Sequence, residues 1–339
     1  MRPFDPIALI DAAYEPSPSA DAWVRRTAAM LAEVLDEERG GYGAYHMGVD
    51  GILRSTVWIE GRMTRPELEL ALAGAAAFAG RCASEDYVRA VQTALGLHEA
   101  FEMTRQTVGG YDEQALACFP SWIVAAPYVA APDGEGGLLT FGFHRSTPFL
   151  RDPKRGAVFK RIAIHLGAGF RLARRREGTA QPEFDWMLDE RGEVVHSTVD
   201  AETREGLRRA ALAISRARRS DAESAQLEAI ETWQGLFSGR WSLVDHFADD
   251  GRRYVVAVAN EPKSPGMGQL SPSQRQVLFY ASLGWTNADI GYALGLRPST
   301  VATHLSRGLE SCGIPSRAQL ISISTALAMS ILRARTPAG

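Results

Sequence analysis

A segment near the end of the chain has side chains arranged to recognise another molecule. At about 100° per residue, its apolar and small residues fall on one helix face: Val301, Leu305, Gly308, Leu309 and Cys312. The opposite face carries Ser299, Thr303, Ser306 and Glu310, bordered by Thr300, Ala302 and Arg307. Because short hydroxyl groups and Arg hydrogen-bond to base edges in the major groove of DNA, this helix is predicted to read DNA.

The residues before this helix must hold it in place. Thr286 and Asp289 have the spacing of a capping box, which predicts that Thr286 begins a helix and that Asp289 reaches back to it. Gly295 can end that helix at positive φ, and Pro298 suits the first turn of the next one. Arg297 stands at the N-cap, where it is a poor capping residue. The pattern predicts a helix–turn–helix.

The same residues carry a family resemblance. The chain contains L-S-P-x-x-R-Q-V-L, then G-x-T-N-x-D-I-x-x-x-L-G-L-x-P-S-T-V-x-x-H-L-S-R, and then G-I-P-S-R-A-Q-L. Together these strongly resemble the LuxR-type (NarL/FixJ) DNA-binding domain over residues 268–330. The resemblance implies an all-α four-helix domain within 270–335, whose third helix enters the major groove and whose fourth helix commonly dimerises.

The resemblance also implies which residues contact double-stranded DNA. Ala302, Thr303 and Ser306 occupy groove-facing positions, and His304 and Arg307 lie near the phosphates. The full expected set is Thr286, Arg297, Ser299, Thr300, Ala302, Thr303, His304, Ser306 and Arg307.

This chain departs from the family pattern at four positions. Family members usually have Lys at 302 and 311, Ser at 297 and an acidic residue at 274, where this chain has Ala302, Ser311, Arg297 and Gln274. Each missing Lys removes about one phosphate contact and lowers the salt slope of binding by about one unit. We therefore expect weak DNA binding by a monomer, with dimerisation or a partner protein needed for useful affinity.

Composition limits the remaining possibilities. The chain has 339 residues, of which 45% are hydrophobic, so several domains are expected. The net charge is −3, but residues 270–339 carry six Arg against Asp289 and Glu310, which leaves −7 for residues 1–269. A basic tail on an acidic body is compatible with nucleic acid that touches only the tail.

Other sequence features favour a regulator over an enzyme. The three cysteines have no C-x-x-C spacing, so neither a thiolate metal site nor a disulfide framework is expected. The sequence has no G-x-S-x-G, H-E-x-x-H, Walker A or phosphoacceptor pattern, and we expect no enzymatic activity and no cofactor. It also lacks a signal peptide and an apolar run of membrane-spanning length, which predicts a cytoplasmic protein.

Residues 15–176 have the pattern of an α+β domain with an antiparallel sheet covered by helices. A helical stripe at 21–37 precedes two strands joined at Asp50-Gly51, and the patterns at 65–81 and 84–101 predict helices. Two strand candidates within 121–145 then lead to an amphipathic helix at 152–176. This order resembles a GAF domain, which implies a sensory or dimerising role.

A ligand pocket in this domain would use aromatic, His and Cys side chains, and the candidates are Tyr42, Tyr45, His46, Trp58, Cys118, Trp122, Phe141 and His144. The same aromatic residues could instead fill the core of the domain, and we favour that interpretation. We expect neither a chromophore on Cys118 nor a haem on His46, His98 or His144.

Residues 183–260 form a second pattern, resembling a divergent PAS-like unit. Two short strands flank Arg191-Gly192, a helical stretch spans 202–233, and a hairpin turns at Asp250-Gly251. Residues 261–269 are rich in Pro and Gly and predict a linker.

Two further patterns in the body have more than one interpretation. The arginine-rich segments 171–177 and 214–221 are interpreted as solvated helix ends rather than nucleic-acid patches. The stripe on the 152–176 helix fits either a dimer seam or the core of its own domain, and consists of Val158, Ile162, His165, Leu166, Gly169 and Leu172.

The sequence therefore predicts a dimeric bacterial transcription regulator that responds to a small-molecule effector or a partner protein. The alternative is a protein-interaction regulator with a degenerate sensor domain, whose tail docks on a partner instead of DNA.

Overall fold

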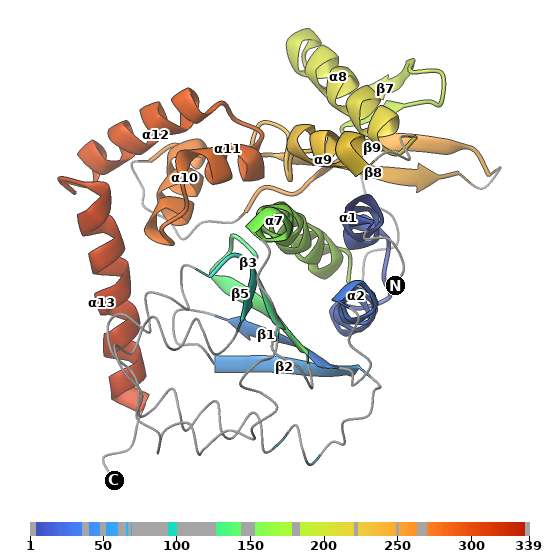
Figure 1. Ribbon diagram of the computed structural model, residues 1–339. Coiled ribbons are helices and arrows are strands. Elements are labelled where there is room, and N and C mark those ends of the chain that lie inside the picture. Colours follow the sequence, from blue (N-terminus) through green and yellow to red (C-terminus); the bar gives the residue numbers. More distant parts are fainter. Residues whose placement is uncertain are drawn as a thin grey trace.

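A computed structural model of the chain (Figure 1) describes residues 5–35, 41–47, 52–59, 66, 69, 94–99, 127–143, 153–177, 184–219, 223–248, 251–262 and 270–335. These residues form an α+β structure with two antiparallel sheets and a C-terminal group of four helices. Their buried apolar side chains form one contiguous core that extends from Ile7 to Leu320.

The first sheet contains the strands that the N-terminal pattern predicts. Within the described residues its order is β2-β1-β5-β4-β3. The strands are β1 (Gly41–Met47), β2 (Ile52–Ile59), β3 (Gly96–Glu99), β4 (Pro127–Pro132) and β5 (Gly137–Phe143). Strands β1 and β2, which flank Asp50-Gly51 in the sequence, pair antiparallel, and β4 pairs antiparallel with β5.

The helix predicted over 84–101 is wrong at its end, because Gly96–Glu99 forms strand β3. Gly96 has a φ of 92°, which breaks a helix, and it pairs with Ala130 of β4. Leu95 and Leu97 are both buried. Hydrogen bonding to a distant strand thus overrides the local helical periodicity. The rest of this helix and the one expected at 65–81 lie almost wholly outside the described residues.

A long central helix, α7 (Pro153–Arg176), covers this sheet as the sequence predicts. The helices α1 (Pro6–Tyr14) and α2 (Ala20–Leu35) pack beside it (Figure 1). A Cβ added at Gly167 would lie 2.2 Å from the Pro132 carbonyl oxygen, and one at Gly169 would lie 2.2 Å from that of Ala13. The apolar stripe of α7 is therefore part of the chain's own core, which settles the choice that the sequence left open.

The second sheet has the order β7-β6-β9-β8 within the described residues. Its strands are β6 (Trp186–Leu188), β7 (Val194–Ser197), β8 (Trp241–Phe247) and β9 (Arg253–Ala259). The helical stretch predicted at 202–233 divides into α8 (Ala201–Ala217) and α9 (Glu223–Thr232). Both hairpins pair as expected.

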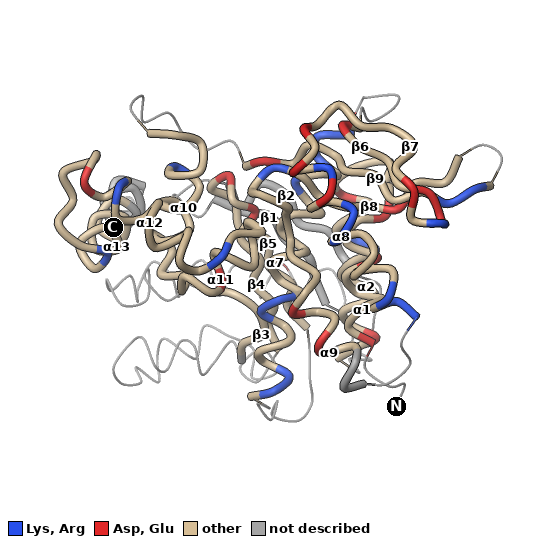
Figure 2. Tube along the Cα trace, turned by 90° about the horizontal axis from the view of Figure 1, so that it is seen from above, with Lys and Arg blue, Asp and Glu red and all other residues tan. Residues whose placement is uncertain are grey.

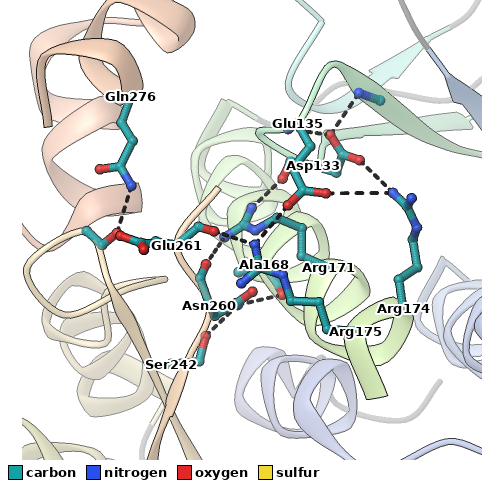
Figure 3. Close-up of polar contacts among 12 residues, drawn as sticks. Asp133, Glu135, Ala168, Arg171, Arg174, Arg175, Ser242, Asn260, Glu261 and Gln276 are labelled. Carbon is teal, nitrogen blue, oxygen red and sulfur yellow. Dashed lines mark hydrogen bonds and ion pairs between the residues drawn. The ribbon is translucent and has the colours of Figure 1, made fainter. Parts of the chain in front are cut away.

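The expectation that the arginine-rich segments are solvated helix ends is wrong for Arg171 and Arg218. Arg171 is 2% exposed and donates to the carbonyl oxygens of Asp133 and Asn260 (Figure 3). In the second segment, Arg218 pairs with Asp11 and lies 2.8 Å from Asp245. Both arginines sit where separate elements meet, because carbonyl and carboxylate groups there need donors.

No helix in the described part of the chain has the length and apolarity to cross a membrane.

Candidate nucleic-acid interface

Four helices form the C-terminal group: α10 (Pro272–Ser282), α11 (Asn287–Leu294), α12 (Pro298–Ser311) and α13 (Arg317–Arg335). Helix α10 begins with a reciprocal capping box. The backbone N–H of Gln274 donates to the Ser271 hydroxyl at 3.2 Å, and the backbone N–H of Ser271 donates to Oε1 of Gln274 at 2.8 Å. Gln274, which departs from the family pattern, therefore satisfies the same cap as an acidic residue would.

The start of α11 is confirmed at Thr286, but its cap differs from the expectation. The Thr286 hydroxyl oxygen accepts from the Asp289 N–H at 3.1 Å, and the hydroxyl donates to the Asp289 carboxylate at 2.7 Å. That carboxylate also accepts from Arg161 of α7 at 3.3 Å. A capping box leaves its acidic side chain for the N-cap backbone, whereas here the carboxylate bonds the Thr286 side chain and a distant helix.

The turn between α11 and α12 has the predicted geometry. Gly295 has a φ of 65°, and Pro298 occupies the first turn of α12. Arg297 is the N-cap residue and makes no side-chain capping bond. A Cβ at Gly291 would lie 2.5 Å from the Leu296 carbonyl oxygen, so this glycine makes room for the turn itself. These local features fix the direction in which α12 leaves α11.

Helix α12 has the two predicted faces. Val301 is fully buried and Leu305 nearly so, and a Cβ at Gly308 would lie 2.9 Å from the Leu278 side chain of α10. Leu309 and Cys312 are half-buried at the edge of this contact. The packed face therefore anchors α12 to the rest of the four-helix group.

The opposite face of α12 is open to solvent. Ser299, Ala302, Thr303, Ser306 and Arg307 are exposed, and Thr300 and His304 are half-buried. The Thr303 hydroxyl donates to the Ser299 carbonyl oxygen at 3.1 Å, so its oxygen remains free to accept. Thr286 and Arg297 are also exposed, at the start of α11 and α12. The structure thus brings these candidate side chains to accessible positions around one helix–turn–helix.

The charge on this surface is low. Helix α12 contains one Arg and one Glu, and the C-terminal helices show few charged segments in Figure 2. Arg307 is therefore the cation of α12 that can contact a phosphate or a guanine. Few cations mean few counterions released on DNA binding, and hence a shallow salt dependence.

The residues expected to bind a ligand lie in three strands of the first sheet or outside the described residues. Tyr42, Tyr45 and His46 lie in β1, and Trp58 lies in β2 with its backbone opposite Tyr42. Phe141 is fully buried in β5, as a core residue would be. Cys118, Trp122 and His144 lie outside the described residues. Ligand binding by this group stays a prediction.

The comparisons agree with the geometry of the four helices. Residues 268–324 match the family described as bacterial regulatory proteins, luxR family. A Mycobacterium tuberculosis protein named as an HTH-type transcriptional regulator is 39% identical over 75 residues, which cover 22% of this chain and 8% of that protein. A Mycobacterium bovis protein with the same kind of name is 37% identical over 75 residues, again 22% of this chain and 8% of that protein.

The chain thus matches only about 8% of the length of these relatives. Residues 268–324 form a luxR-family helix–turn–helix domain, as the sequence predicts. The family match covers residues 268–324 and does not extend to the two sheets.

Proposed function

We propose that this chain is a DNA-binding transcription regulator whose helix α12 reads the major groove. The observation that carries the proposal is the exposed small polar face of α12, held in place by a packed apolar face within a luxR-family domain. The names of the mycobacterial relatives support the same function.

The roles of the individual residues follow from their positions on α12. Thr303 and Ser306 present hydroxyl groups to base edges, and Ala302 offers a methyl group to a thymine methyl. Arg307 and His304 lie beside this face and contact phosphates or a guanine. Thr286, Arg297, Ser299 and Thr300 cluster at the helix starts, where backbone and side-chain donors meet DNA phosphates.

A second copy of the chain completes the DNA-binding unit. Ile323 and Leu327 of α13 are 49% and 54% exposed, which is high for large apolar residues. Pairing through α13 would place two α12 helices on half-sites about 34 Å apart, one turn of DNA. Because one α12 offers few cations, two copies would also double the number of phosphate contacts.

The two sheets are proposed to be the sensory part of the regulator. In this assignment residues 15–176 form a GAF-like domain and residues 183–260 form a PAS-like unit. Residues 261–269 connect them to the four C-terminal helices, residues 270–335, which we call the reader. The antiparallel sheets, with α7 and α8 beside them, are consistent with such units. The effector would be a small molecule or a partner protein.

The DNA-binding function is tested with the full chain and a randomised pool of duplexes. Retained duplexes are selected, sequenced and used in a mobility-shift titration. The variant Arg307→Glu should lose most of the affinity, because it places a negative charge beside the phosphates. Its control is Arg209→Glu, which makes the same charge change at an exposed position of α8. No duplex retained by the wild type, or equal loss in both variants, would refute the proposal.

A further inference from the structure

Helix α11 is buried from Asp289 to its end, more completely than its packing on α10 and α12 explains. Every residue from Asp289 to Leu294 is buried. Ile290 and Leu294 face α10 and α12, as expected for the first helix of a helix–turn–helix. Asp289, Tyr292 and Ala293 occupy the other face, yet they are only 7%, 5% and 3% exposed. Residues 1–269, which we call the body of the chain, cover them.

The Tyr292 hydroxyl belongs to a buried hydrogen-bonded group that joins three distant segments. It donates to the Ile230 carbonyl oxygen of α9 at 2.7 Å and lies 2.9 Å from Nε2 of His165 on α7. The same Nε2 lies 2.7 Å from the Trp233 carbonyl oxygen. Because a carbonyl oxygen only accepts, Nε2 carries the proton. Nδ1 lies 2.9 Å from the Tyr14 hydroxyl, which donates to the Gly235 carbonyl oxygen at 3.2 Å.

Arg161 forms a second connection between α7 and α11. Its guanidinium lies 3.3 Å from the Asp289 carboxylate and 3.1 Å from that of Glu231. It also stands 4.2 Å from the centre of the Tyr292 ring. The Arg161 and Asp289 side chains are only 17% and 11% exposed, so solvent screens this ion pair less than a surface pair.

The loop between α9 and β8 forms further hydrogen bonds with α10 and α11. The Gly235 N–H donates to the Tyr292 carbonyl oxygen at 3.2 Å, and the Gly239 N–H donates to that of Leu294. The Gln276 amide of α10 donates to the Gly239 carbonyl oxygen at 2.9 Å (Figure 3). We call the contacts of α11 with α7, α9 and residues 233–239 the α11 latch.

Helix α7 links this latch to the first sheet. A Cβ at Gly96 of β3 would lie 3.0 Å from the Lys160 backbone, next to Arg161 of the latch. Two residues beyond His165, Gly167 packs directly on Pro132 of β4. Such contacts leave no free space, so a change in the sheet must move α7 and with it the latch residues.

The latch also bears on the access of DNA to the reader. When a helix–turn–helix binds DNA, its second helix lies in the major groove and its first helix crosses the phosphate backbone. Here the first helix is α11, and the body covers its face formed by Asp289, Tyr292 and Ala293.

We propose that the α11 latch is autoinhibitory: in the docked state the body covers one face of the helix that would cross the DNA backbone, and release of α11 permits tight binding. Rearrangement of the first sheet releases it through α7. This inference rests on the proposed DNA-binding function and adds how that function is regulated.

The variant Tyr292→Phe tests the latch, because the lost hydroxyl bonds only the body and leaves the packing of the reader intact. Loss of a buried partner should favour the released state and tighten binding of the selected duplex by about fivefold or more. Arg161→Gln, which removes the ion pairs from the body side, should act in the same direction. The matched control is Tyr254→Phe, which removes a half-buried hydroxyl on β9 and should leave the affinity unchanged.

Hydrogen exchange on the intact chains gives a second measurement. Amides of α11 and of residues 229–239 should exchange faster in Tyr292→Phe than in the wild type, while α12 keeps its protection and so reports a folded reader. Unchanged or weaker DNA binding by both folded variants would overturn the latch and leave the proposed function standing. Failure of the wild type to retain any duplex would overturn both.

Discussion

Lowering the pH should weaken the junction around His165, and the structure gives the size of the effect. Burial removes this imidazole from water and lowers its pKa from 6.5 to about 3, and the positive charge of Arg161 acts in the same direction. The hydrogen bond to Trp233 opposes this shift. The native chain therefore keeps His165 neutral at a pH where the unfolded chain protonates it.

The sign and magnitude follow from proton linkage. Between pH 6.5 and 3 the unfolded chain binds more protons than the native chain, so the contribution of His165 is complete above pH 6.5 and is lost as the pH falls. A pH of 5 lies about 1.5 units below the pKa of the imidazole in the unfolded chain. At about 1.4 kcal/mol per unit, the free energy of unfolding falls by about 2 kcal/mol from this group alone.

Urea unfolding followed by tryptophan fluorescence at pH 7 and pH 5 measures this loss. The wild type should lose about 2 kcal/mol more than His165→Gln, whose side chain does not titrate. Asp11, whose pKa is raised chiefly by burial, contributes with the opposite sign, but it is common to both proteins and cancels in the comparison. Parallel pH dependence in the two proteins would refute the neutral, buried His165.

Three further outcomes are expected. Ala302→Lys should steepen the salt dependence of DNA binding by about one unit, measured by fluorescence anisotropy at several salt concentrations; an unchanged slope would place residue 302 away from phosphates. Gly295→Ala should lower the melting temperature in calorimetry, because φ is 65° and the added Cβ would lie 2.2 Å from the Leu236 carbonyl oxygen; an unaltered value would contradict this close approach. Ile323→Asp with Leu327→Asp should yield monomers in sedimentation analysis, and persistent dimers would exclude pairing through this part of α13.

Much of the reader domain could be predicted because its determinants are local. The cap at Thr286, the positive φ of Gly295 and the apolar spacing of α12 all depend on residues within a few positions of one another. The hairpins around residues 50 and 250 follow from equally short signals. The two faces of α12 therefore agree with the sequence.

The contacts between distant segments could not be predicted in this way. The sequence gives Asp289 only a capping role and gives Tyr292 none, yet α7 contacts both from more than a hundred positions away. Gly96–Glu99 reads as the end of a helix until β4 is available as a partner. Arg171 reads as solvated because the carbonyl groups that need it come from other elements.

The most direct test of major-groove reading by α12 is methylation protection of guanine N7 on a duplex selected by the full chain, since N7 faces only the major groove. We expect protected guanines in two half-sites about one turn of DNA apart, with the protection lost in Arg307→Glu. Retention of the duplex with every guanine N7 still reactive, or protection that Arg307→Glu leaves intact, would contradict the assignment of α12 as the DNA-reading helix.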